Sequence, residues 1–149
     1  MRYALCLLAF LTIAFACQRK AMSSDGTTQV SQTHSVGYNE SVDLAIGDGL
    51  TLNKNGKGFS FVGVAEDSRC PEGVDCIRAG EAFVLVQMTG VEAPPRRIKV
   101  DAGGKPAGRF GMRGGTVQVL DLLPRPREGV KRDSSAYRLR VRVVEAVAY

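Results

Sequence analysis

The sequence contains no tryptophan and only one histidine, His34, among its 149 residues. A serine or cysteine nucleophile needs an adjacent base, which is most often a histidine. His34 lies before the region in which strand-like patterns begin, so the domain that we expect from residue 39 onward would contain no histidine. These absences argue against a Ser–His or Cys–His hydrolase. A pair of carboxylates could still act as acid and base.

Long hydrophobic runs are also missing, with one exception at the N-terminus. Residues 3–16 are almost entirely apolar, follow Met1-Arg2, and are too few for a comfortable membrane span. The run ends in Ala14-Phe15-Ala16 directly before Cys17, which resembles a bacterial lipobox. We therefore expect a lipoprotein signal peptide over residues 1–16 and an acylated Cys17. An ordinary signal peptide cut near Ala16 is the alternative.

Residues 17–38 lack periodic apolar positions and are rich in Ser, Thr, Gln and Gly. Such a segment buries too little surface to offset its ordering entropy. We expect it to be a flexible tether between the acylated Cys17 and a single domain at 39–149. The protein would then be exported and attached to a membrane by its lipid. Gln18, in place of Asp, favours the outer membrane, with the domain facing the periplasm or the surface.

Cysteines are few, and their positions limit the possible sites. Cys6 leaves with the signal peptide and Cys17 is the lipidation candidate, so Cys70 and Cys76 form the only pair in the domain. A structural zinc site needs four ligands, and thiol redox chemistry prefers C-x-x-C. In an exported protein we expect a Cys70–Cys76 disulfide, which would add about 2 kcal/mol of stability. We expect no metal and no cofactor.

No stretch of the domain shows a helical period. Alternating apolar and polar residues instead predict short β-strands separated by turn signals. The predicted strands cover residues 42–46, 50–52, 59–64, 83–88, 97–100, 116–123 and 137–143. Asn55-Gly56 is a hairpin signal, and the glycine-rich residues 110–115 are interpreted as a turn. The expected fold is all-β, a single antiparallel β-sandwich or small barrel of about seven to eight strands.

The alternation also predicts a core. The inward positions of the strongest strand patterns are all large hydrophobic residues. The core residues that we expect are Phe59, Phe61, Val84, Val86, Val119, Leu139 and Val141.

Charge is distributed unevenly along the domain. Residues 39–93 carry four Lys and Arg against nine Asp and Glu, whereas residues 94–149 carry thirteen against five. The two halves could form a bipolar surface or could interleave and pair. The same alternatives apply to a candidate basic face formed by Arg138, Arg140 and Arg142, which would meet either an anionic envelope component or acids of the first half. Nucleic acid is not an expected partner, because no aromatic residues are interleaved with the basic ones.

The segment from Glu66 to Ala82 concentrates five acidic residues and both domain cysteines between two predicted strands. Its carboxylates could hold Ca²⁺, although the spacing does not match an EF-hand, or they could pair with neighbouring arginines. The candidate binding-loop residues are Asp67, Arg69, Asp75, Arg78 and Glu81.

This segment also resembles a motif of uncharacterised bacterial exported proteins and lipoproteins, D-S-R-C-P-x-x-V-x-C-x-W-A-G-x-A. The matching positions run from Asp67-Ser68-Arg69-Cys70-Pro71 to Ala79-Gly80 and Ala82. The tryptophan of the motif is replaced by Arg78. The resemblance implies an exported β-domain that presents a motif loop between two strands, and it implies no activity.

Together, these patterns predict a membrane-anchored envelope lipoprotein whose β-domain has a binding or structural role. It would not be an enzyme, and its partner would be an anionic envelope component or a protein. The alternative function is a metal-dependent or carboxylate-based hydrolase that uses the acidic loop Glu66–Glu81.

Overall fold

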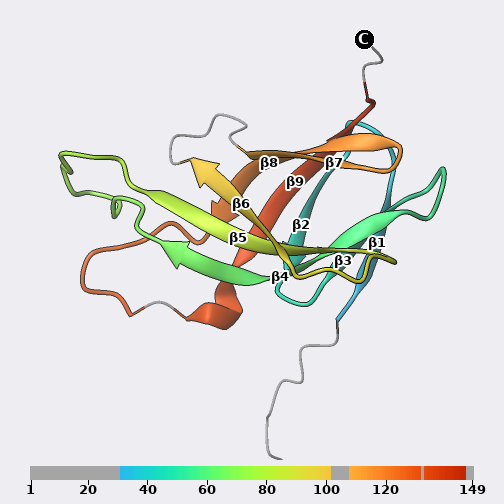
Figure 1. The fold of residues 1–149 in the computed structure, drawn as a ribbon. Helices are drawn as coiled ribbons and strands as arrows, with labels where there is room; N and C mark the ends of the chain where they lie inside the picture. Colours follow the sequence, from blue (N-terminus) through green and yellow to red (C-terminus); the bar gives the residue numbers. More distant parts are fainter. Residues whose placement is uncertain (1–30, 102–107, 132, 147–149) are drawn as a thin grey trace, which may run out of the picture.

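The computed structural model describes residues 31–101, 108–131 and 133–146, which form nine β-strands arranged in two sheets (Figure 1). A single short 3₁₀ helix, Ser134–Ala136, is the only helix in these residues. The strands are β1 (Thr33–Val36), β2 (Ser41–Ala45), β3 (Gly49–Leu52), β4 (Gly58–Asp67), β5 (Glu81–Met88), β6 (Arg96–Asp101), β7 (Gly108–Met112), β8 (Gly115–Leu123) and β9 (Arg138–Val144).

One sheet has the strand order β1-β3-β4-β5-β6 and the other has the order β2-β9-β8-β7. All neighbouring strands are antiparallel except β1 and β3, which are parallel. Neither sheet closes into a barrel among the described strands. The all-β prediction is confirmed, but the described strands exceed the seven or eight expected.

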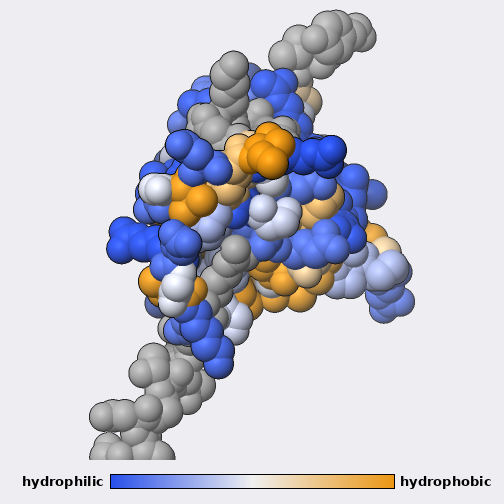
Figure 2. Space-filling model, turned by 90° about the vertical axis from the view of Figure 1, so that its left-hand side faces the viewer, coloured by the Kyte–Doolittle hydropathy of each residue, from blue (hydrophilic) through white to orange (hydrophobic). Residues whose placement is uncertain are grey.

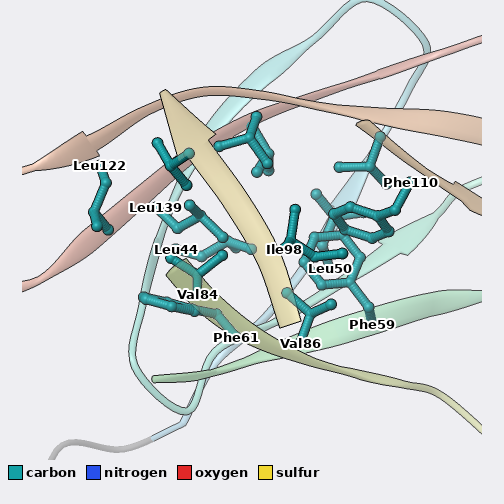
Figure 3. Packing of buried hydrophobic residues seen from close by; sticks show 14 of the residues in the cluster. Leu44, Leu50, Phe59, Phe61, Val84, Val86, Ile98, Phe110, Leu122 and Leu139 are labelled. Atoms are coloured by element: carbon teal, nitrogen blue, oxygen red, sulfur yellow. The ribbon is translucent and has the colours of Figure 1, made fainter. Parts of the chain in front are cut away.

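The core lies between the two sheets. All seven predicted core residues are buried, and Figure 3 shows side chains of both sheets pointing toward one another. Tyr137, Leu139, Val141 and Val143 face inward along and just before β9, as the alternation predicted. An edge-to-face contact between Phe59 of β4 and Phe110 of β7, with ring centroids 5.0 Å apart, also joins the two sheets.

The predicted tether over residues 17–38 extends too far toward the domain. Residues 33–36 form strand β1, which pairs in register with β3 from Thr33–Gly49 to Val36–Leu52. Val36 is buried in the core. The prediction was wrong here because parallel pairing with β3 supplies the backbone hydrogen bonds, and one buried valine is too weak a pattern to reveal a strand. Residues 17–30, including Cys17, lie outside the described residues.

The prediction of a turn over the glycine-rich residues 110–115 was also wrong in part. The turn is confined to Arg113-Gly114, whereas residues 108–112 form strand β7, with Phe110 and Met112 buried. Glycine is required at position 108, because a Cβ there would lie 2.4 Å from the carbonyl oxygen of Lys99. Gly108 thus allows β7 to approach β6 closely, and only Gly114 lies in the turn itself.

No helix in the described part of the chain has the length and apolar character needed to cross a membrane.

Candidate functional site

The motif loop, defined here as residues 68–80, connects β4 to β5 and protrudes from one end of the molecule (Figure 1). Cys70 and Cys76 form the predicted disulfide, with their Cα atoms 6.0 Å apart. Two backbone hydrogen bonds continue the strand pairing at the base of the loop. The N–H of Ser68 donates to the carbonyl of Glu81 at 2.8 Å, and the N–H of Cys70 donates to the carbonyl of Ala79 at 2.9 Å. The loop is therefore closed at its base as well as by the disulfide.

Gly80 allows the two ends of this loop to approach closely. Its φ angle is +66°, and a Cβ at this position would lie 1.9 Å from the carbonyl oxygen of Ser68. Both the backbone angle and the contact require glycine. The glycine of the Ala79-Gly80 pair in the motif is therefore needed for closure of the loop.

Arg69 anchors the motif loop in the interior. Its side chain is only 3% exposed, and its Nε and Nη2 each donate a hydrogen bond of 2.9 Å to the carboxylate of Asp67. The same guanidinium donates to the carbonyl of Pro124 at 3.0 Å and to the carbonyl of Leu122. Because these carbonyls lie at and just after the end of β8, Arg69 joins the motif loop of one sheet to the other sheet.

Asp67 completes this buried network. Its side chain is also 3% exposed, and the hydroxyl of Tyr137 donates to it at 2.9 Å. Burial by itself would raise the pKa of Asp67, but the hydrogen bonds from Arg69 and Tyr137 and the charge of Arg69 lower that pKa overall. Asp67 therefore remains a carboxylate paired with Arg69. This arrangement fixes structure and offers no proton for chemistry near neutral pH.

A groove of about 680 Å³ lies beside the motif loop. Its apolar lining comes mostly from the connection between β8 and β9, and Glu72 of the motif loop forms part of its wall. The N–H of Glu72 donates to the carbonyl of Pro126 at 2.9 Å, and its carboxylate lies 3.4 Å from Nε of Arg127. Groove and motif loop thus form one continuous end of the molecule. Figure 2 faces this end and shows separate hydrophobic patches among hydrophilic side chains.

The five carboxylates of the acidic segment do not meet at one point. Glu66 pairs with Arg97, Glu81 pairs with Lys99, and Glu72 pairs with Arg127. Asp67 is bound to Arg69 in the interior. No group of three or more potential metal ligands occurs among the described residues. Four of the five acids are therefore held in separate ion pairs.

The remaining candidate binding-loop residues are Asp75 and Arg78, which are both exposed on the motif loop. Ile77, between Cys76 and Arg78, is fully exposed. Ile77 was not among the predicted binding-loop residues. Its signal was an isolated large hydrophobic residue directly beside a disulfide cysteine.

The arginines of β9 have three different environments. Arg140 makes two hydrogen bonds of 2.7 Å to Asp43 of β2, which lower the pKa of that carboxyl. Arg142 donates to Gln118 at 3.0 Å, and Arg138 donates to the backbone carbonyls of Ser135 and Tyr137. The central arginine of the candidate basic face is therefore paired with an acid of the first half.

This pairing extends to the two halves of the domain. Among the described residues, four ion pairs join an acid of residues 39–93 to a base of residues 94–149. The neighbouring strands β5–β6 and β2–β9 bring together Glu81 with Lys99 and Asp43 with Arg140. The pair Glu66–Arg97 spans β5, and the pair Glu72–Arg127 joins two loops. Of the two alternatives that the sequence left open, the halves interleave and pair.

His34 belongs to the fold and not to a tether. Its Nε2 lies 3.4 Å from Oδ2 of Asp48, and the backbone N–H groups of Gln32 and Ala45 each donate to this carboxylate at 2.9 Å. Burial would raise the pKa of Asp48, but the hydrogen bonds from Gln32, Ala45 and His34 lower it. Asp48 thus binds β1 to the turn before β3. The assumption of a domain without histidine was wrong.

Comparison with known proteins gives no further guidance: no family model, no curated protein and no solved structure matches this chain.

Proposed function

We propose that this protein is a membrane-anchored lipoprotein of the bacterial envelope, and that its β-sandwich-like domain binds a protein partner through the motif loop and the adjacent groove. The membrane attachment is supported by the signal-like residues 1–16 and by Cys17 directly after them. The disulfide agrees with an oxidising compartment.

The observation that carries the binding proposal is the anchoring of the motif loop by Arg69. A loop that a disulfide, a buried ion pair and the Glu72–Pro126 hydrogen bond hold in place loses little entropy when it binds. At this end the exposed side chains include Ile77 on the loop and Val130 in the groove wall. Exposed apolar side chains on a rigid frame are typical of a protein-binding surface.

The hydrolase alternative has less support. It requires two carboxylates near one another, whereas four of the five acids of the motif segment each pair with a different cation. An anionic envelope component is a further alternative for the arginines of β9, but Arg140 is already bound to Asp43.

Crosslinking in living cells tests the binding proposal. A photoreactive amino acid placed at Ile77, and in a second strain at Val130, should capture the same envelope protein. The same label at exposed Val62 of β4 is the matched control and should not capture it. Capture of different proteins at the two positions, or equal capture at Val62, would contradict a shared binding surface.

Membrane attachment is tested separately. Mass spectrometry of the mature N-terminus should find an acylated cysteine at position 17, and Cys17→Ser should release the protein from membranes. An unmodified N-terminus downstream of Cys17 would refute the lipoprotein part and leave the binding surface open to its own test.

A further inference from the structure

A second hollow, of about 370 Å³, lies at the end of the molecule opposite the motif loop. It is formed where three connections meet: residues 53–57 between β3 and β4, residues 89–95 between β5 and β6, and residues 113–114 between β7 and β8 (Figure 1). We call it the hairpin hollow. Its volume is in the range of small-molecule sites.

Hydrogen bonds hold the rim of the hairpin hollow in place. Asn55 donates from its side chain to the carbonyl of Arg113 at 3.0 Å, which ties the first connection to the third. The N–H of Thr89 donates to the carbonyl of Gly58 at 3.0 Å, which ties the second connection to the start of β4. The hollow is therefore preformed, so a ligand would not need to organise it.

The lining combines two kinds of side chain. Met88, Val91 and Met112 supply an apolar surface, and methionine adapts its shape to apolar ligands. Lys57 and Arg113 supply two positive charges. Gly58, Gly90 and Gly111 complete the lining, so backbone also faces the hollow.

The two cations of the hollow have exposed side chains. Other exposed bases, such as Arg97, Lys99 and Arg140, each pair with an acid on another strand. Within residues 31–101, 108–131 and 133–146, neither Lys57 nor Arg113 has an ion-pair partner, yet both line the same hollow. Two unpaired cations beside an apolar surface match a ligand that carries a negative charge at one end and an apolar chain at the other.

We propose that the hairpin hollow binds a small amphiphilic anion, whose phosphate or carboxylate lies against Lys57 and Arg113 and whose alkyl chain packs on Met88 and Met112. This site is independent of the motif loop and of the function proposed for it.

Octyl phosphate is a suitable probe, used below its micelle concentration with protein produced from the full-length chain and labelled at its methionine methyl groups. Titration followed by NMR should shift the Met88 and Met112 signals, which substitution of each methionine by leucine assigns. Octanol has only the alkyl chain and inorganic phosphate has only the charge, so each should bind at least about tenfold more weakly than octyl phosphate.

Charge and shape can be tested with matched pairs of variants. Lys57→Gln/Arg113→Gln should weaken octyl phosphate binding about tenfold or more. Lys54→Gln/Arg109→Gln makes the same charge change on the same hairpin and on β7 at residues outside the lining, so it should bind as the parent does. Val91→Ala should remove part of the apolar lining and weaken binding about threefold or more, whereas Val62→Ala, at an exposed valine outside the lining, should not.

Three outcomes would overturn the proposal. The first is absence of any shift at Met88 and Met112 with octyl phosphate. The second is an equal loss of binding in the two double-glutamine variants, which would indicate general charge attraction only. The third is binding to vesicles of anionic phosphatidylglycerol without any binding of octyl phosphate, which would assign the charges to a membrane surface.

Discussion

The guanidinium of Arg69 and the carboxylate of Asp67, two residues apart in the chain, form a buried pair through two parallel hydrogen bonds of 2.9 Å. Both residues belong to the segment that resembles the D-S-R-C-P motif of exported proteins. Their contacts with Leu122, Pro124 and Tyr137 show that this part of the motif connects the two sheets. The exposed part of the motif is the loop tip that they hold in place.

Removal of the buried cation should strongly destabilise the fold. Arg69→Met leaves the carboxylate of Asp67 in the interior without its counter-charge, and we expect the free energy of unfolding to fall by about 3 kcal/mol. Urea denaturation measures this change. The double variant Arg69→Met/Asp67→Asn should recover part of the loss. The control Arg127→Met breaks an exposed pair and should cost less than about 1 kcal/mol. Equal effects of the two arginine variants would contradict the assigned role of Arg69.

The pH dependence of stability should reflect Asp67. Because the pKa of Asp67 is lower in the folded than in the unfolded state, the unfolded chain binds this proton first as the pH falls. The stabilisation is complete above the unfolded-state pKa of about 3.9, and it is lost as the pH falls toward the folded-state pKa. Asp43 and Asp48, whose pKa values are also lowered, contribute with the same sign.

Urea unfolding as a function of pH checks this expectation. The contribution of these aspartates to the free energy of unfolding should be nearly constant from neutral pH to about pH 5. It should decrease below about pH 4. Asp67→Asn should reduce the acid-induced decrease, whereas Asp75→Asn at the exposed loop tip should leave it unchanged. An undiminished decrease in Asp67→Asn would show that other carboxylates dominate.

Loss of the disulfide should affect the motif loop more than the sheets. Cys70→Ser/Cys76→Ser should lower the free energy of unfolding by about 2 kcal/mol, because the disulfide closes a short ring. Hydrogen exchange should become faster within residues 71–79, while β4 and β5 stay protected through their own pairing. Loss of protection throughout β5 would mean that the disulfide is needed for the sheet itself.

Truncation of Phe110 should test the unexpected strand β7. Phe110 is buried against Phe59, so Phe110→Ala should cost about 3–5 kcal/mol, as is typical of large cavities in a core. The control Arg109→Ala, exposed on the same strand, should leave the urea midpoint nearly unchanged. A small effect of Phe110→Ala would indicate that residues 110–115 are the turn that the sequence suggested.

Alternation of apolar and polar residues was enough to predict most of the fold. Seven of the nine described strands, the burial of Val84 and Leu139, and the inward face of β9 follow from a period of two residues. The expectation of export, together with the cysteine number, was enough to predict the disulfide. Strands β1 and β7 were missed because their evidence is not local: β1 has one buried valine, and β7 begins at Gly108, where β6 passes close.

The sequence by itself determined the strand type, the core and the position of the motif loop, since these depend on residues close together in the chain. Only the tertiary structure decided which charges meet. Asp43 and Arg140 are 97 positions apart, and the pairing of β2 with β9 brings them together. The same holds for Arg69, whose carbonyl partners come from the end of β8, and for the unpaired cations of the hairpin hollow. Charge–charge contacts depend on strand order, and residue patterns within one strand carry no information about which distant strand lies beside it.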